Sequence, residues 1–321
     1  MTDITAARHN NLYARINNII GNGAGRNGYG QGLGIGYGDA PESFAVSKLS
    51  DSDVNLVTAE TLNSIYADML RCRIHQIGTE PTEIAELVAN ANIIAEDTSY
   101  EVTDEGVIVI DPDGTKKGIL DFETVMSQVE TNKFSVHPSQ ASVEPGITSQ
   151  RSTPWNGLIY HEFTVTFRNA DHRRHFFNTG GIIRISASNS GASNAKGLDW
   201  GQLCSSMGVI EFKYNETVSS DLAITTLIGN YELTTTYQTI FNYVGGGLYS
   251  GVYNTNLCRI KAKTVSDNVI SFRVEFNDVA NAGFADENVT GRLLSTIQHY
   301  RADSVYISVP APTYTNISNL S

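Results

Sequence analysis

The spacing of apolar residues changes near residue 136, and this change limits the folds open to the chain. Before it, apolar residues recur every three or four positions, as on one face of an α-helix. Beyond residue 158 they alternate with polar residues, as in a strand with one buried face. The pattern predicts an α+β protein: a helix-rich N-terminal region plus an antiparallel β domain with one or two short helices.

Helical spacing is clear in three stretches of the N-terminal region, residues 1–135. The first ends at Gly21, and the others cover residues 58–78 and 121–134. A further short helix is predicted from Pro81, because proline suits a first helical turn. Before the third helix, the stretch EGVIVIDPDGTKKGILDF predicts two short β runs around a Pro-Asp-Gly turn.

A glycine-rich loop, residues 21–38, reads GNGAGRNGYGQGLGIGYG and contains the spacing G-x-G-x-x-G of dinucleotide-binding loops. That chemistry requires a buried strand before the glycines and a helix after them. Here a helix is predicted before them, and no apolar run follows. We interpret the loop as a mobile or surface-draped connector whose tyrosines can dock locally on a neighbour, and we expect no nucleotide and no other cofactor.

Between the two regions, residues 136–157 carry prolines and serines without periodicity, which predicts a linker or an extended arm. The β domain, residues 158–321, follows. Strands are predicted at YHEFTVTF, GGIIRISAS and YELTTTYQTIFNYV, and one clear helix at KGLDWGQLCSSMG. A hairpin is predicted to turn at residues 266–268, with four charged side chains on its outer face: Lys261, Lys263, Arg273 and Glu275.

Candidate metal ligands are the three histidines His161, His172 and His175. They lack the H-E-x-x-H spacing of zinc hydrolases, so we expect no metal. The basic stretch DHRRH at 171–175 is interpreted as a solvated turn or short helix. Residues 111–114 begin like a calcium loop, but the later ligands are missing, which favours a turn.

Other signals of chemistry are weak. The sequence holds neither a G-x-S-x-G elbow nor a P-loop, so we expect no enzymatic activity. A net charge of −12 argues against nucleic-acid binding. Neither a membrane span nor a secretory signal is visible, so synthesis in the cytoplasm is expected. Cys72, Cys204 and Cys258 are expected to be buried reduced thiols.

Three stretches point to a family as a set: ARINNIIGNGAGRNGYGQ, TAETLNSIYADMLRCRIHQIG, and WNGLIYHEFTVTFRNADHRRHFFNTGGIIRISAS through WGQLCSSMGVIEF. They resemble virion structural proteins of contractile-tailed bacteriophages, especially those infecting cyanobacteria, from residue 8 to about residue 215. The resemblance implies a non-enzymatic part of the neck or collar, tail or baseplate, located in the virion after synthesis in the host cytoplasm. It implies contacts with other phage structural proteins and brings no catalytic residues.

The first helix suggests how such a protein could form a homo-oligomer. A helix of this length is marginal alone in water, so its stripe of Leu12, Ile16 and Ile19 needs a partner surface. The glycine-rich loop lets that surface lie on the chain's own β domain or on a neighbouring subunit, and we expect the neighbour. Trp155, at the end of the predicted arm, completes the expected assembly interface.

Two other functions remain open. The alternative is a receptor- or glycan-binding module on a tail appendage that uses Trp155, Tyr243 and Tyr249, and a glycan-degrading tail enzyme comes third. Glycan binding requires these aromatic side chains to be exposed in a groove. Pure assembly requires them to be buried against another subunit.

Overall fold

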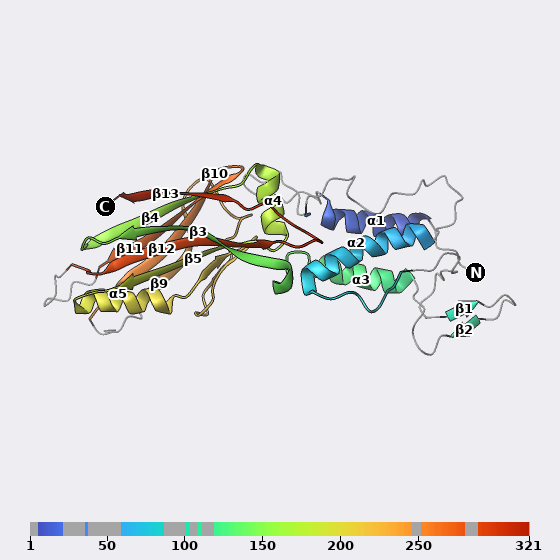
Figure 1. Cartoon of the computed structure of the whole chain (residues 1–321), viewed down its shortest axis with the longest axis horizontal. Helices are drawn as coiled ribbons and strands as arrows, with labels where there is room; N and C mark the ends of the chain where they lie inside the picture. The colour runs from blue at the N-terminus through green and yellow to red at the C-terminus, as the bar shows by residue number, and fades with distance from the viewer. Residues whose placement is uncertain are drawn as a thin grey trace. The chain divides into compact units, whose positions relative to one another are not determined.

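The fold of the 321-residue chain is α+β, as its periodicity predicts. The computed structural model describes residues 6–21, 36–37, 59–86, 100–102, 108–110, 119–245, 252–279 and 288–320. These residues form two compact units (Figure 1). We call them the helical unit, with the described residues up to Ala141 and Ala302–Ser308, and the β unit, with the described residues from Ser142 to Arg301 and from Val309 onward.

Three helices form the core of the helical unit: α1 (Ala6–Ile20), α2 (Ala59–Ile77) and α3 (Ile119–Thr131), each in contact with the other two. All three were predicted. The apolar face of α3 is buried as its spacing requires, at Ile119, Phe122, Val125, Met126 and Val129. Helix α2 ends at Gly78, whose φ of 79° lies in the left-handed region that favours glycine.

Two sequence predictions in this unit need correction. Residues 81–86 are not helical, although Pro81 predicted a helix start. Tertiary contacts decide here, because Glu83 accepts a hydrogen bond from Gln128 of α3 and Ile84 is buried. In addition, the second predicted β run begins helix α3 instead. The rest of the predicted helix and the turn at 111–114 lie outside the described residues.

The first predicted β run is present. It supplies strand β2 (Ile108–Ile110), which pairs antiparallel with β1 (Tyr100–Val102).

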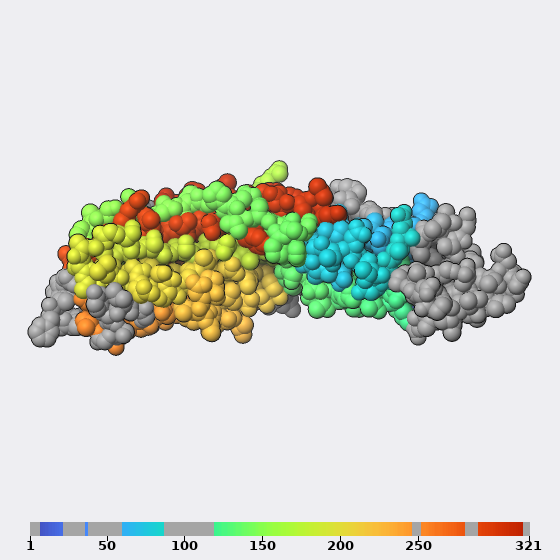
Figure 2. Space-filling view, turned by 60° about the horizontal axis from the view of Figure 1, so that its bottom comes forward, coloured from blue at the N-terminus to red at the C-terminus, as the bar shows by residue number. Residues whose placement is uncertain are grey.

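The β unit contains two antiparallel sheets. The five-stranded sheet has the order β13-β4-β11-β10-β9, with bounds Thr313–Leu320, Gly157–Thr166, Val269–Asp278, Leu257–Ser266 and Gln238–Val244. The six-stranded sheet has the order β3-β12-β5-β6-β7-β8, with bounds Ala141–Arg151, Arg292–Ala302, Ile182–Ser190, Ile210–Phe212, Thr217–Ser219 and Thr225–Thr226. Figure 2 shows residues of β3 (green), β12 (red) and β5 (yellow) side by side at the surface.

The segment 136–157, predicted to be a linker or an extended arm, contains regular structure. It holds a 3-10 turn, η2 (Pro138–Gln140), and the edge strand β3. Only Ser149 of β3 is buried, so the strand lacks the alternation of apolar and polar residues that reveals a half-buried strand in a sequence. Conversely, only the second half of YELTTTYQTIFNYV forms a strand, β9, because hydrogen bonds of Thr234 to Gln238 and Thr236 fold the first half into turns.

Two helices of the β unit close its core. Asn169 caps α4 (Ala170–Asn178) and Asn194 caps α5 (Ala195–Ser206), each by accepting a hydrogen bond from a backbone N–H of the first turn. Helix α4 brings Phe176 and Phe177 against rings from Phe167 and Phe212. Helix α5 brings Trp200 against Trp155 and Phe276.

Helix α4 is the DHRRH stretch. The prediction of a short helix is confirmed. The prediction that the stretch is solvated is wrong for Arg173 and Arg174, because each is only 2% exposed. The Arg173 guanidinium donates to Asn230 Oδ1 at 2.7 Å and Thr264 Oγ1 at 3.1 Å, so it fastens α4 to a loop and to strand β10. Burial lowers the pKa of Arg173 to about 10.

Candidate functional site

The four residues predicted for the assembly interface lie in the core of this chain. Leu12, Ile16 and Ile19 are 0%, 0% and 3% exposed in the helical unit. Trp155 is 5% exposed in the β unit and packs edge-on against Trp200, with ring centroids 5.1 Å apart. The stripe of α1 is therefore covered by α2 and α3 of the same chain, and neither the β domain nor a neighbouring subunit is needed to bury it.

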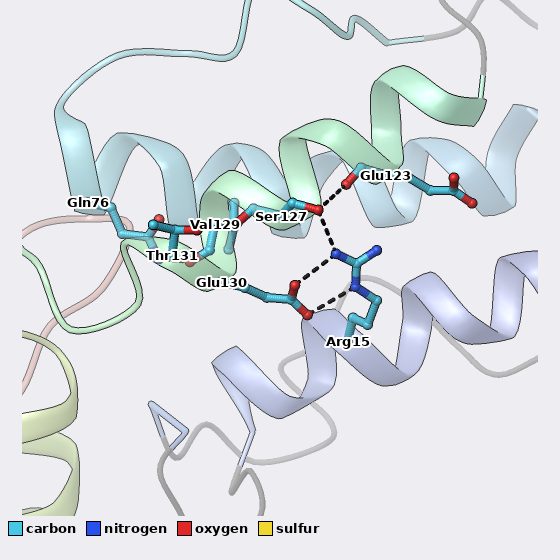
Figure 3. A network of polar contacts seen from close by, with 7 residues as sticks. All are labelled: Arg15, Gln76, Glu123, Ser127, Val129, Glu130 and Thr131. Carbon is cyan, nitrogen blue, oxygen red and sulfur yellow. Dashed lines mark hydrogen bonds and ion pairs between the residues drawn. The ribbon is translucent and has the colours of Figure 1, made fainter. Parts of the chain in front are cut away.

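Two ion pairs fix α1 on α3, and Figure 3 shows the one between Arg15 and Glu130. Arg8 binds Glu123 at 2.7 Å, and Arg15 binds Glu130 at 2.8 Å. The sequence separation is 115 residues in both pairs, so the two helices run in the same direction. Arg15 also donates to Ser127 Oγ at 3.0 Å. Apolar and charged contacts thus agree in placing α1 on its own chain.

The described end of the glycine-rich loop is docked as well. Tyr37 is 2% exposed, and its hydroxyl accepts a hydrogen bond from Gln76 Nε2 at 2.8 Å. Its ring meets that of His75 edge-on, with centroids 5.3 Å apart. Tyr37 therefore docks on α2, a contact that the sequence left open for the tyrosines of this loop. Residues 22–35, which include the whole G-x-G-x-x-G motif, lie outside the described residues.

The three histidines considered as candidate metal ligands lie on two different elements. His172 and His175 share α4, with ring centroids 6.0 Å apart, whereas His161 belongs to β4. Within the described part of the chain, no three His, Cys, Asp or Glu side chains are grouped as a metal site requires. Cys72, Cys204 and Cys258 are buried thiols that form no disulfide, as predicted.

His161 instead forms a core contact that sequence reasoning missed. Its Nδ1 lies 2.8 Å from Ser295 Oγ of β12, and both side chains are fully buried. Burial, together with the positive charge of Arg151, lowers the pKa of His161 to about 4. The distance would suit a nucleophile and its base, but a substrate cannot reach a pair with no exposed surface. The pair therefore links the two sheets.

The most distinctive surface lies on the outer face of the five-stranded sheet. The register brings side chains from the three strands β4, β11 and β10, together with one from the turn before β9, into rows across this face. We call these residues the outer-face cluster: Tyr160, Glu162, Tyr237, Arg259, Lys261, Lys263, Arg273 and Glu275.

Arg273 occupies the middle of the outer-face cluster. Its guanidinium lies 4.3 Å from the ring centroid of Tyr160 and 4.4 Å from that of Tyr237, and it binds Glu162 at 2.9 Å. Lys263 Nζ lies 4.4 Å from the same Tyr237 ring. Both contacts with Tyr237 are within the range of a cation–π interaction. Two cations therefore occupy this ring, which leaves it poorly suited to stacking against a sugar.

Glu275 organises the other side of the outer-face cluster. Its carboxylate lies 2.7 Å from Arg259, which is directly opposite it in β10, and 2.8 Å from Lys261, two residues further along that strand. These two cations cover the carboxylate so well that its side chain is only 4% exposed. Lys263 differs, because among the described residues it forms no ion pair with a carboxylate.

Hydrogen bonds connect Tyr237, in the turn before β9, to strands β11 and β4 of the outer-face cluster. The Tyr237 hydroxyl lies 2.8 Å from Ser271 Oγ, which donates to Glu162 Oε1 at 3.2 Å. Burial raises the pKa of Tyr237 to about 12, and its bond to Glu162 adds to the rise. Burial opposes ionisation of Glu162, but hydrogen bonds from Tyr237 and Arg273 outweigh it and lower the pKa of that carboxyl.

An apolar row borders the outer-face cluster. The register aligns Leu158, Asn277, Leu257 and Val244 across four strands. Leu158 and Val244 are 51% and 52% exposed, which is high for aliphatic side chains on a sheet. Polar and cationic groups beside exposed apolar ones make this face suitable for contact with another protein surface.

The balance of charge on this face is opposite to that of the chain. The outer-face cluster has four cationic side chains and two carboxylates, an excess of two positive charges, whereas the whole chain carries −12. Every carboxylate of the cluster is already paired, so the face can bind an acidic surface without leaving its own anions unpaired.

Comparisons of the chain with protein-family models, with curated proteins and with solved structures found no match. Among the described residues, no helix combines the length and the apolar character needed to cross a membrane.

Part of the outer-face cluster can be predicted from the sequence. The hairpin predicts Lys261, Lys263, Arg273 and Glu275 on one outer face, and the structure places them there. It does not predict that β4, about 100 residues earlier, pairs with β11 and supplies Tyr160 and Glu162. The alternation of apolar and polar residues in β4 indicates which of its side chains point outward, but no local signal in the sequence specifies its neighbour in the sheet.

Proposed function

We propose that this protein is a non-enzymatic structural component of a tailed-phage virion, in the neck or collar, the tail or the baseplate. In this proposal it forms a homo-oligomer and contacts other virion proteins. The resemblance of its N-terminal two thirds to phage virion proteins supplies the biological setting. The structure supplies a surface suited to assembly, different from the one the sequence predicts.

One observation carries the proposal: an acidic chain presents a face with a positive excess. Copies of a chain with net charge −12 repel one another on average, so specific association needs a local region of opposite sign. The outer-face cluster provides it, and the exposed Leu158 and Val244 add apolar area that association would bury. The partner we assign to this face is an acidic surface of a second copy.

The alternative of a receptor- or glycan-binding module has less support. Trp155 is 5% exposed and packed against Trp200, so it cannot stack on a sugar. Tyr237, the aromatic residue at the centre of the outer-face cluster, already contacts Arg273 and Lys263. Tyr243 is half-buried, and Tyr249 lies outside the described residues.

Purified phage particles test the proposed location. Particles are collected by density-gradient centrifugation from lysates of a phage that encodes this chain, and their proteins are identified by mass spectrometry. We expect the chain in the particle fraction at a fixed ratio to known tail and capsid proteins. Its presence only in the soluble fraction of the lysate would contradict a virion role.

A further inference from the structure

A buried ion pair joins helix α5 to strand β11. Lys196 Nζ lies 2.8 Å from Asp278 Oδ2, and the two side chains are 2% and 0% exposed. Lys196 is the second residue of α5, and Asp278 is the last residue of β11. Trp200, one helical turn after Lys196, meets Phe276, two residues before Asp278, with ring centroids 6.0 Å apart. The pair therefore lies between two elements whose aromatic side chains also meet.

Burial distinguishes this pair from an ion pair of the same length. Lys261 Nζ and Glu275 Oε1 are also 2.8 Å apart, but the Lys261 side chain is 25% exposed and water stabilises its charge. Around Lys196 and Asp278 both charges have lost their water, which costs several kcal/mol per ion. A reaction that removes both charges is favoured where both are buried and not where the ammonium, as in Lys261, stays partly in water.

We propose that Lys196 and Asp278 condense to an isopeptide bond, a covalent cross-link between α5 and β11. A proton first moves from the Lys196 ammonium to the Asp278 carboxylate, which gives a neutral amine and a carboxylic acid. The Lys196 nitrogen then attacks Cγ of Asp278, and a C–N bond forms. One C–O bond of Asp278 breaks, and its hydroxyl takes a proton from the nitrogen and leaves as water. An amide and one water molecule result, and no oxidant, reductant or cofactor is consumed.

The geometry favours this step. Well-oriented groups in one molecule react as if at about 10⁵–10⁸ M, and here the fold holds amine and carboxyl in contact. Asp199, three residues after Lys196, is 1% exposed and shares its face of α5. Its carboxyl can carry the proton that the leaving hydroxyl requires.

Intact-mass spectrometry of the purified full-length chain under denaturing conditions is the test. We expect a mass lower than that of the sequence by one water molecule. Trypsin should then fail to cut after Lys196, and a branched peptide should join residues 185–213 to residues 274–292. Cleavage after Lys261 should proceed normally, because its ammonium is partly exposed to water and stays charged.

The masses of two variants show whether a loss of water comes from the proposed cross-link or from another reaction. Lys196→Arg keeps a cation beside Asp278 but should have the mass of its own sequence, since a guanidinium does not condense under these conditions. Asp199→Asn should slow the conversion, and conversion at the wild-type rate would remove Asp199 from the step. A wild-type mass equal to that of the sequence, in fresh and in stored protein, would overturn the proposal, as would a water loss located elsewhere. The wild-type measurement alone decides if a variant fails to fold, and it is independent of whether the protein belongs to a virion.

Discussion

Single residues of this protein show how burial changes chemistry that the sequence only suggests. His161, Arg173 and Lys196 would pass for ordinary surface residues in an acidic chain, yet each is almost entirely enclosed. An enclosed polar group must be hydrogen-bonded or neutral, because water is not there to solvate it. His161 illustrates the neutral case and Arg173 the hydrogen-bonded one, and each makes a measurable prediction.

The pKa of His161 makes the β unit sensitive to acid. In the folded state this pKa is about 4, against an ordinary value of 6.5, so between these values the unfolded chain binds a proton that the folded chain does not. Stability from His161 is therefore present above pH 6.5 and is lost as the pH falls toward 4. Between pH 7 and pH 4.5 this lowers the free energy of unfolding by about 2.5 kcal/mol.

His161→Gln tests the effect, because glutamine can still bond to Ser295 but does not titrate. Urea unfolding followed by tryptophan fluorescence reports on the β unit alone, since both tryptophans, Trp155 and Trp200, belong to it. The variant should lose about 2.5 kcal/mol less than the wild-type protein over this pH range. Equal losses in the two proteins would show that His161 is not the group responsible.

Arg173→Ala should destabilise the β unit by about 3 kcal/mol, because it leaves buried acceptors on Asn230 and Thr264 without their donor. Arg168→Ala is the matched control, since Arg168 is exposed just before the same helix and its loss should change stability by less than about 0.5 kcal/mol. Similar midpoints of urea unfolding for both variants would contradict the structural role of Arg173.

At the scale of elements, the helical unit depends on the packing of α1 against α2 and α3. Apolar burial supplies most of the stabilisation, and the two ion pairs set the register, since a shift of one residue would separate both arginines from their carboxylates. This explains why the sequence predicted a helix in need of a partner but assigned the wrong one. A partner 115 residues away in the same chain leaves no local signal.

A charge swap tests this register. Arg15→Glu should destabilise the helical unit by about 1 kcal/mol, because it places a third carboxylate near Glu123 and Glu130. Adding Glu130→Arg should restore about half of that loss. Thermal unfolding followed by circular dichroism measures both. A double variant less stable than Arg15→Glu alone would mean that the two side chains do not pair.

The elements also show where sequence reasoning is reliable. Strong periodicity identified α3, the β10–β11 hairpin and α5, because each buries one clear face. It missed β3, an edge strand with a single buried residue, and it extended β9 too far toward its N-terminus. The outer-face cluster could be predicted only for the hairpin, whose strands are neighbours in the chain. Its remaining residues come from elements that meet through the sheet order.

In the whole molecule, we propose that the outer-face cluster lets this acidic chain associate with its own copies. Lys263 is the best position at which to test this, because its ammonium lies over the ring of Tyr237 and forms no ion pair among the described residues. Reversing its charge therefore disturbs few contacts inside the chain. Lys213, which is 31% exposed beside Glu211 and Glu216, offers a matched control away from this face.

Light scattering during size-exclusion chromatography measures the mass of the protein in solution, and this mass tests association through the outer-face cluster directly. The intact chain, Lys263→Glu and Lys213→Glu are compared at matched concentrations, after tryptophan fluorescence has established that each is folded. The intact chain should have the mass of an oligomer. Lys263→Glu should need at least about tenfold more protein to reach that mass, because like charges would then meet across the interface. Lys213→Glu should match the intact chain. An intact chain that stays monomeric at every concentration, or a Lys263→Glu variant that associates as the intact chain does, would contradict assembly through this face.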